Sequence, residues 1–390
     1  MLEGFQFHSP TRVLYGAGVS AELGGELARY GARRALIVTE KILRDIGIAG
    51  KIEKALAGST AEVVAVFDGV VPNSELAIVR AGLAQARAAG VDLVVAVGGG
   101  SAMDTAKAIN MALSHGGDPM DYQGAQMLSG PCKPLIAIPT TAGTGSEVSN
   151  VSAIHDAANK TKVLFVDNHL MPDLAVLDPE LTLSMPARVT AATGMDALTH
   201  AIESYVSSQA FPIADGLALQ AAHLIAENLI PVVRDGTNLT ARGRMLAAAC
   251  MAGMAFTQAG VGCVHAMSHA TGGIFGVAHG EANSILLPAG MEFNIAECPE
   301  RFAELARALG VRETRGLGPA EAGHKAIERV RQMQVLLKEH SGLASRLSEV
   351  GVDEARLPEI AAAALLDGAM IYNRRIADES DVLTMLKNSF

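Results

Sequence analysis

The sequence predicts an α/β domain built on a parallel sheet, followed by an all-α domain. In the first half, short runs rich in Val, Ile and Ala alternate with helix-like stretches, and strands separated in this way need crossover connections. From Ala187 onward the chain carries long Ala-, Leu- and Met-rich patterns at helical spacing and no convincing strand run. The boundary therefore falls near Pro186, and we expect domains of residues 1–186 and 187–390.

The elements of both halves follow from their apolar spacing and from the Gly and Pro residues that bound them. We expect buried strands at Ala35–Thr39, Ala61–Phe67, Leu93–Val97 and Leu135–Ile138. Helices are expected in the first half at Ala21–Tyr30, Lys41–Ala57 and Glu75–Ala89. In the second half the patterns predict helices that include Ala214–Leu229, Gly243–Phe256 and Glu300–Leu309.

Composition excludes several classes of partner. The formal net charge of -10 at pH 7 leaves no basic surplus to neutralise nucleic-acid phosphates. Apolar runs such as Leu93–Val97 and Leu135–Pro139 are too short to span a bilayer, and the N-terminus lacks the pattern of a signal peptide. We therefore expect no membrane association. Four cysteines without CxxC spacing predict reduced, buried thiols of a cytoplasmic protein: Cys132, Cys250, Cys263 and Cys298.

Two glycine-rich turns follow expected strands and are suited to a nucleotide. In the first, Gly98, Gly99 and Gly100 let a diphosphate approach the backbone, and Ser101 is expected to cap the next helix. Asp104 is expected in the first turn of that helix, where the helix dipole stabilises its charge. The second turn, residues 138–149, places three threonine hydroxyls among glycines, at Thr140, Thr141 and Thr144. These hydroxyls suit phosphate, ribose or a nicotinamide amide.

A competing dinucleotide motif lies near the N-terminus. Gly16–Ala21 matches the GxGxxA fingerprint, with Glu40 about twenty residues later. The stretch before Gly16 is short for a supporting strand, so an ordinary turn before a helix is the simpler interpretation. Glu40 is better supported, because it ends an expected strand where an acid can bind ribose hydroxyls and repel a 2′-phosphate. This favours NAD over NADP.

Three histidines and an aspartate in the second half form a candidate metal site. Asp196 and His200 lie four residues apart and share a helical face, while His265 and His279 follow in two glycine-rich segments. Three imidazoles and a carboxylate suit Fe²⁺ or Zn²⁺ and leave positions open for a substrate oxygen. Buried histidines are also common as hydrogen-bonded core residues, and Cys263 is an alternative soft ligand.

Four motifs in order carry a family resemblance: GGGSAMDTAKA, PTTAGTGSEVS, GMDALTHAIESY and HAMSHATGGIFGVAHGEANSILLP. Together they resemble the iron-containing (group III) alcohol dehydrogenases, from VLYGAGV to about residue 370. The resemblance implies a Rossmann-like α/β domain and a helical domain in a dehydroquinate synthase-like architecture. It also implies NAD, Fe²⁺ or Zn²⁺ as cofactors, and a homo-oligomer built as a dimer or a multiple of dimers. One departure is the segment Tyr372–Arg375, which lacks the proline of the family's Asn-Pro-Arg-like pattern.

The resemblance assigns the metal to Asp196, His200, His265 and His279. It implies cofactor contacts from Glu40, Asn73, Gly98, Gly99, Gly100, Ser101, Asp104, Thr140, Thr141, Thr144, Ser149 and Lys162. His269 lies one helical turn after His265, and we expect it to relay a proton, orient a ligand or contact the nicotinamide. Phe256 and Phe275 are candidates for the wall of a substrate channel, with ordinary core packing as the alternative.

The expected reaction is reversible hydride transfer between a small primary alcohol or short diol and NAD⁺, which gives an aldehyde. From Val189 to Glu300 the only basic residues are Arg234, Arg242 and Arg244, so an anionic substrate is disfavoured. Two alternatives remain open within the shared architecture. One is a secondary-alcohol oxidoreductase like glycerol dehydrogenase, and the other is a dehydroquinate-synthase-like lyase.

Overall fold

The computed structural model describes residues 4–157, 161–312, 314 and 316–390. Their contacts group the chain into two compact units. The α/β unit consists of Ser9–Thr141 and Gly145–Ser184. The helical unit consists of Met185–Phe390 together with Met1–His8 and Ala142–Thr144, so two short segments from the first half of the chain belong to it.

A six-stranded parallel sheet forms the centre of the α/β unit, in the order β1-β9-β6-β4-β2-β3. Its central strands are buried Val-, Ile- and Ala-rich runs, as parallel strands covered on both faces should be. The strand bounds are β1 Arg12–Tyr15, β2 Arg34–Glu40, β3 Glu62–Val70, β4 Leu93–Gly98, β6 Leu135–Pro139 and β9 Leu174–Leu177. All four expected strands are confirmed. The edge strand β1 and its partner β9 were not expected.

Helices cover both faces of this sheet, and each face has its own apolar core. On one face, alternate residues of β2 and β4, such as Leu36 and Val94, pack against α4 Leu76–Ala88 and α5 Gly100–His115. On the other face, residues such as Ile37 and Val95 pack against α1 Leu23–Glu26 and α3 Ile48–Leu56. This is the two-sided arrangement that crossover connections produce.

Two expected helices are broken. The stretch expected as one helix over Lys41–Ala57 forms α2 Lys41–Asp45 and α3, because Gly47 adopts φ 83° between them. The stretch Ala21–Tyr30 forms the 3₁₀ turn η1 Val19–Glu22, the short α1 and the 3₁₀ turn η2 Leu27–Tyr30. Glycines at positions 24 and 25 weaken a continuous α-helix there.

A second, three-stranded sheet has the order β5-β8-β7. Its strands are β5 Gly124–Ala125, β7 Val151–Asp156 and β8 Thr161–Val166, with β7 and β8 antiparallel. Three 3₁₀ turns complete the unit: η3 Pro119–Tyr122, η4 Asn168–Leu170 and η5 Pro179–Thr182. Residues Ile154 and Phe165 of this sheet join the α4–α5 core.

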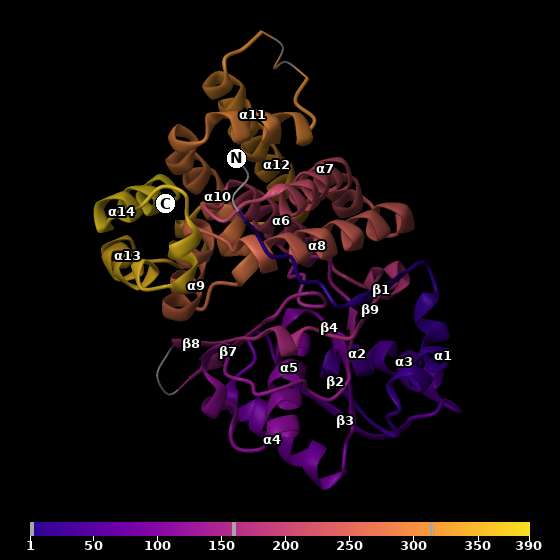
Figure 1. Cartoon of the computed structure of the whole chain (residues 1–390). Helices are drawn as coiled ribbons and strands as arrows, with labels where there is room; N and C mark the ends of the chain where they lie inside the picture. Colours follow the sequence, from indigo (N-terminus) through magenta and orange to yellow (C-terminus); the bar gives the residue numbers. More distant parts are fainter. Residues whose placement is uncertain (1–3, 158–160, 313, 315) are drawn as a thin grey trace. The chain divides into compact units, whose positions relative to one another are not determined.

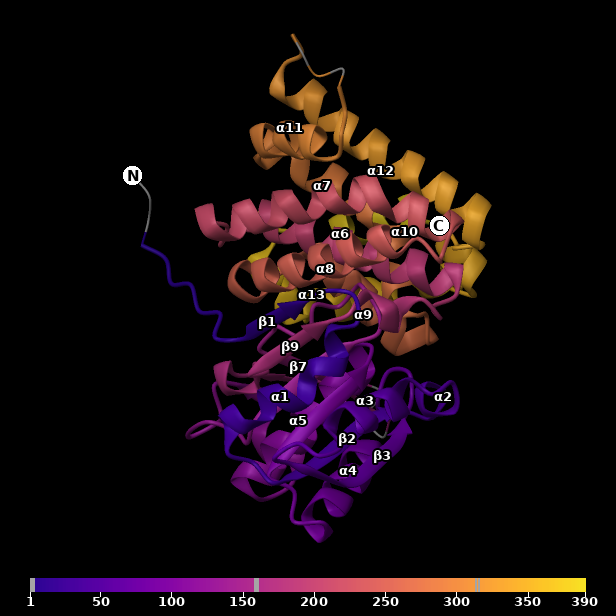
Figure 2. The same cartoon turned by 90° about the vertical axis from the view of Figure 1, so that its right-hand side faces the viewer.

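The helical unit contains nine α-helices in the described residues, around one continuous core. Three long helices, α6 Ala187–Val206, α7 Pro212–Arg234 and α8 Leu239–Ala259, lie side by side (Figures 1 and 2). Small residues permit this close packing, since a Cβ added to Gly194 of α6 would lie 2.3 Å from a methyl carbon of Leu229 on α7. The other helices are α9 Cys263–Phe275, α10 His279–Asn294, α11 Pro299–Ala308, α12 Pro319–Ser341, α13 Leu357–Leu365 and α14 Glu379–Asn388. Short 3₁₀ turns lie between them: η6 Ile295–Glu297, η7 Leu347–Val350, η8 Glu354–Arg356 and η9 Gly368–Tyr372.

The helix α7 is long and apolar enough to cross a membrane, which the short apolar runs in the sequence did not indicate. Its apolar face packs against α6 and α8, and Ile225 and Leu229 are fully buried there. We therefore regard α7 as a core helix of the helical unit. A parallel-sheet unit followed by a helical unit confirms the predicted fold class.

Candidate metal centre and cofactor site

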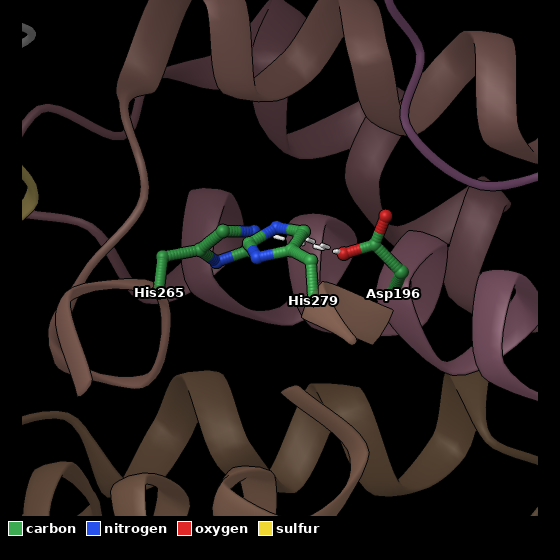
Figure 3. A group of neighbouring side chains, drawn as sticks. All are labelled: Asp196, His265 and His279. Carbon is green, nitrogen blue, oxygen red and sulfur yellow. Dashed lines mark ion pairs between the residues drawn. The ribbon is translucent and has the colours of Figure 1, made fainter. Parts of the chain in front are cut away.

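Three side chains from three helices of the helical unit point toward one another (Figure 3). Asp196 on α6, His265 on α9 and His279 on α10 each offer one ligand atom, and these atoms all lie within 4.8 Å of one another. The Asp196 Oδ1 atom lies 3.5 Å from His279 Nε2 and 3.9 Å from His265 Nε2. Asp196 and His265 are each 2 % exposed, so the group lies inside the unit.

Neighbouring side chains fix which nitrogen of each ring faces this group. His265 Nδ1 lies 2.6 Å from Glu203 Oε2, and His279 Nδ1 lies 3.1 Å from Ser268 Oγ. The Nε2 atoms of both rings are therefore directed at Asp196. The Asn283 amide donates to Asp196 Oδ1 at 2.7 Å, which holds the carboxylate in place.

His200 lies beside the group without being one of the three converging donors. Its ring stacks on Phe256, with centroids 4.4 Å apart, and lies tilted against the His265 ring, with centroids 4.5 Å apart and 32° between the planes. Burial lowers the pKa of His200 to about 4, partly opposed by the charge of Asp196, so the ring is neutral near pH 7. Among the described residues its Nδ1 atom is buried without a hydrogen-bond partner, as is Asn283 Oδ1.

These features fit a divalent cation. The donors are a carboxylate oxygen and imidazole nitrogens, which is the set that Fe²⁺ and Zn²⁺ accept. The buried atoms of His200 and Asn283 that lack partners add unused lone pairs beside the three donors. A bound cation would also explain why an aspartate is buried among histidines, because a buried carboxylate without a partner of opposite charge is unfavourable.

His269 lies one turn after His265 and forms an ion pair with Asp367, at 2.8 Å between Nδ1 and Oδ2. Its ring stacks on His279, with centroids 5.2 Å apart and 15° between the planes. Burial alone would raise the pKa of Asp367, but the His269 hydrogen bond and charge and the Ala369 amide outweigh it, and the pKa is lowered. The pair therefore places an ionised carboxylate behind a histidine that contacts the candidate centre.

In the α/β unit, the predicted cofactor residues gather at the carboxyl ends of adjacent strands. Glu40 ends β2, Gly98 ends β4, and Thr140 follows β6, and these three strands are neighbours in the sheet. The chain reverses its direction of travel across the sheet between β2 and β4, and such a point is the usual ligand site of an open parallel sheet. Gly99 packs against Thr141, since an added Cβ would lie 3.2 Å from the threonine Oγ1.

Details of the first glycine turn differ from expectation. The N-cap of α5 is Gly99, and Ser101 lies inside the helix, where its Oγ accepts a hydrogen bond from the Asn73 amide at 3.2 Å. Asp104 lies beyond the first turn of α5, so the prediction that the helix dipole stabilises its charge is wrong. Its carboxylate instead accepts hydrogen bonds from Ser146 Oγ at 2.7 Å and from the Ala153 amide at 3.1 Å. It therefore braces the second glycine-rich turn.

Three predicted cofactor residues remain, and the charge of one of them, Lys162, acts on the Asp104 carboxylate. Ser149 is buried and binds the ammonium group of Lys107, which donates to its carbonyl at 2.8 Å. Lys162 lies on β8 opposite His155. Thr144 belongs to the helical unit.

The N-terminal GxGxxA turn has its own partner. The Asp178 carboxylate accepts hydrogen bonds from the Gly18 and Ser20 amides, at 3.0 and 3.1 Å, and from Ser20 Oγ at 2.5 Å. These amides are therefore already paired within the protein. A strand, β1, does precede the turn, but a 3₁₀ turn follows it instead of a long helix. The ordinary-turn interpretation accounts for this geometry.

Several residues around the centre were not identified from the sequence: Glu203, Ser268, Asn283 and Asp367. One signal was available for Glu203, because positions 196, 200 and 203 share one face of α6. Asn373, in the segment that lacks the family's proline, accepts from the Cys263 amide at 3.1 Å and so caps α9. Cys263 itself is buried, and its sulfur interacts with Asn294.

A parallel-sheet unit with a ligand edge and a helical unit with a buried metal-type cluster define a metal-dependent, dinucleotide-linked oxidoreductase. Residues 10–179 match the family described as iron-containing alcohol dehydrogenase. Residues 190–390 match the C-terminal part of the Fe-containing alcohol dehydrogenase family. The chain belongs to the iron-containing alcohol dehydrogenase family.

Relatives cover essentially the whole chain. It is 39 % identical over 388 residues to 1,3-propanediol dehydrogenase of Klebsiella pneumoniae, covering 99 % of each chain. It is 38 % identical over 383 residues to the NAD-dependent methanol dehydrogenase of Bacillus methanolicus, covering 98 % of this chain and 99 % of the relative. The crystal structure of a 1,3-propanediol oxidoreductase superposes with a TM-score of 0.96 at 39 % identity, with complete coverage of both chains. The predicted enzyme, an NAD-dependent iron-type alcohol dehydrogenase, is confirmed, and neither alternative is better supported.

Proposed function

We propose that Asp196, His200, His265 and His279 hold the Fe²⁺ or Zn²⁺ ion of this dehydrogenase, and that the helical unit binds the alcohol. One observation carries the proposal: three ligand atoms from three separate helices converge within 4.8 Å. His200 is included because the centre of its ring lies 4.5 Å from that of His265 and its Nδ1 atom has no hydrogen-bond partner among the described residues.

A bound divalent cation in such a site acts as a Lewis acid, which lowers the pKa of an alcohol hydroxyl or polarises an aldehyde carbonyl. The Asp196 carboxylate supplies one negative charge, and the neutral histidines leave most of the cation's charge for the substrate. His269 contacts His279 and takes up or releases the hydroxyl proton. Asp367 holds the His269 ring by its Nδ1 atom, so Nε2 is the nitrogen that exchanges the proton.

We propose that the α/β unit binds NAD(H) at the carboxyl edge of β3, β2, β4 and β6. Asn73 and Ser101 contact each other there, and Glu40 accepts a hydrogen bond from the Gly99 amide. Glu40 recognises the ribose hydroxyls and disfavours a 2′-phosphate. The absence of side chains at Gly98–Gly100 lets the diphosphate approach the start of α5, and Thr140 and Thr141 bind the nicotinamide side of the cofactor.

The proposed substrates are small neutral primary alcohols or short diols and their aldehydes. Relatives are named for 1,3-propanediol and methanol, both of which are short and uncharged. Arg242 is 2 % exposed, and its guanidinium binds the Thr190 hydroxyl and the Gly236 and Met185 carbonyls. The Arg242 guanidinium is therefore held by hydrogen bonds inside the helical unit and does not favour an anionic substrate. We further propose a cytoplasmic homo-oligomer, a dimer or a multiple of dimers; the free cysteines support the reducing location.

His279→Ala tests the metal assignment, with His223→Ala as the matched control. His223 lies on α7 and contacts the Ala308 carbonyl at 3.2 Å. We expect H279A to lose metal on dialysis and to lose NADH production from a panel of short alcohols, while H223A keeps both. Full turnover by metal-free H279A would refute the proposed chemistry. Activity with secondary alcohols alone would favour the glycerol-dehydrogenase-like alternative.

A further inference from the structure

We propose that Glu203 is a positioning residue for the metal centre, which sets His265 in the one tautomer that can bind a cation. The inference rests on the metal centre proposed above and assigns a role to a residue that does not touch the ion. The Glu203 carboxylate lies on α6, two turns after Asp196, and is 4 % exposed.

Each oxygen of this carboxylate has a defined partner on α9. Oε1 accepts from the Val264 amide at 2.7 Å. Oε2 accepts from the His265 amide at 3.2 Å and faces His265 Nδ1 at 2.6 Å. The same side chain therefore binds the start of α9 and the imidazole ring that α9 carries.

The chemistry of these partners determines the tautomer. Both oxygens of Glu203 already accept hydrogen bonds from backbone amides, so the side chain acts as the acceptor toward the ring as well, and His265 Nδ1 carries the proton of this hydrogen bond. A neutral imidazole protonated at Nδ1 has its lone pair on Nε2. That atom lies 3.9 Å from Asp196 Oδ1, on the side of the candidate ligand group. The Asn283 amide nitrogen lies 3.2 Å from this Nε2 atom, and Glu203 is the partner that faces Nδ1 on the opposite side of the ring. An imidazole protonated at Nε2 cannot bind a cation through that atom.

Glu203 also connects two ligands mechanically. Asp196 and Glu203 are on the same helix, α6. The Glu203 carboxylate, which holds His265, therefore moves together with the Asp196 carboxylate, which is proposed to bind the same cation as His265. A displacement of α9 relative to α6 would have to break three hydrogen bonds at this one side chain. Carboxylates in such outer positions typically contribute ~10–100-fold in metal affinity.

The alternative is that Glu203 only stabilises the start of α9. The structure offers a control for that role, since Asn373 caps the same helix at the Cys263 amide and does not contact the His265 ring. Glu203→Gln has the same shape but only one carbonyl oxygen. If that oxygen takes the Oε1 position at the Val264 amide, the NH₂ group faces both the His265 amide and Nδ1 and favours the wrong tautomer. The opposite orientation places NH₂ against the Val264 amide.

The test compares Co²⁺ affinity of apo wild type, E203Q and N373A by the visible absorption of bound Co²⁺, with thermal unfolding measured in parallel. We expect E203Q to weaken Co²⁺ binding ~10–100-fold, and N373A to weaken it less than ~3-fold at a comparable loss of thermal stability. Equal weakening in both variants, or none in E203Q, would overturn the inference while the metal centre stands. A wild-type protein that binds no Co²⁺ would overturn the metal centre and this inference with it.

A second measurement needs no variant. In histidine-labelled apo wild type, long-range ¹H–¹⁵N correlations report which ring nitrogen is protonated. We expect His265 to be protonated at Nδ1 at pH 8, with the assignment made by comparison with His265→Gln. Protonation at Nε2 would overturn the inference, even if E203Q failed to fold.

Discussion

Gly280→Ala should separate two proposed metal ligands without altering either one. Gly280 is the second residue of α10 and follows His279 directly. A Cβ added there would lie 2.5 Å from the carbonyl oxygen and 2.9 Å from the carbonyl carbon of Ala192 on α6. Both are backbone atoms, so no side-chain rotation can relieve the contact.

The magnitude follows from these distances. An ordinary carbon–oxygen contact is ~3.3 Å, so α10 must move away from α6 by roughly 0.5–1 Å. His279 Nε2 and Asp196 Oδ1 are 3.5 Å apart, close to the ~3.4 Å that two ligands at ~2.1 Å from a tetrahedral ion require. After the shift that separation would be ~4–4.5 Å, well beyond the ~3.4 Å of a tetrahedral site, so both side chains could no longer bind one ion in that arrangement. We expect about 1–3 kcal/mol of destabilisation and a ~100-fold loss of turnover.

The assay combines metal content after dialysis, the melting temperature by calorimetry and NADH formation from a short alcohol. Gly216→Ala is the matched control, because that exposed α7 glycine has no atom within 4 Å of an added Cβ. An alanine there should stabilise the helix by ~0.5–1 kcal/mol. A G280A protein with full metal content and a melting temperature equal to that of G216A would refute the reasoning.

Three further predictions concern the α/β unit. Burial raises the pKa of Glu147 to about 7, opposed in part by its own backbone amide and the charge of Lys107. The pKa of Glu147 in the folded protein lies above its ordinary value of 4.5, so wild type should lose stability relative to Glu147→Gln as pH rises from about 4.5 to 7, by up to ~3 kcal/mol. Equal pH dependence of both unfolding curves would contradict this. Asp178→Ala should destabilise the protein by about 2–4 kcal/mol, because the Gly18 and Ser20 amides lose their hydrogen-bond acceptor. The affinity for NAD should stay within ~2-fold. A large loss of NAD binding, measured by calorimetric titration, would show that the turn does belong to the cofactor site. Glu40→Gln should lower the KM for NADP ~10-fold relative to that for NAD, and an unchanged ratio would dissociate Glu40 from the ribose.

Local signals in the sequence were sufficient for the main elements. The buried strands β2, β4 and β6 contain continuous apolar runs, and the half-buried edge strand β3 begins with one, so their identity does not depend on distant partners. The edge strand β1 is only four residues long, and β7 and β8 alternate partly exposed with buried residues. Such strands exist because a neighbour pairs with them, which a local pattern does not report.

The residues of the candidate site were likewise predicted only where the signal in the sequence is local. His265 and His269 were found because they lie one turn apart in a glycine-rich segment. Their carboxylate partners were missed because Glu203 is 62 residues away from His265 and Asp367 is 98 residues away from His269. Hydrogen bonds between distant residues arise from helix packing, and a single sequence carries no record of that packing. Ser101 was misplaced by two residues for a smaller reason, since caps depend on backbone geometry at the helix end.

The helical unit includes two short segments from the first half of the chain, and this has a consequence for protein engineering. The helical unit includes Ala142–Thr144, where Gly143 lies so close to Thr193 that an added Cβ would be 2.7 Å from the threonine Cβ. It also includes Met1–His8, where the ring of Phe5 stacks on Phe211 at 4.5 Å. A fragment expressed from residue 187 onward would lack both pieces. Grafting the helical unit onto another protein would therefore require three separate stretches of sequence, and grafting the α/β unit would require two.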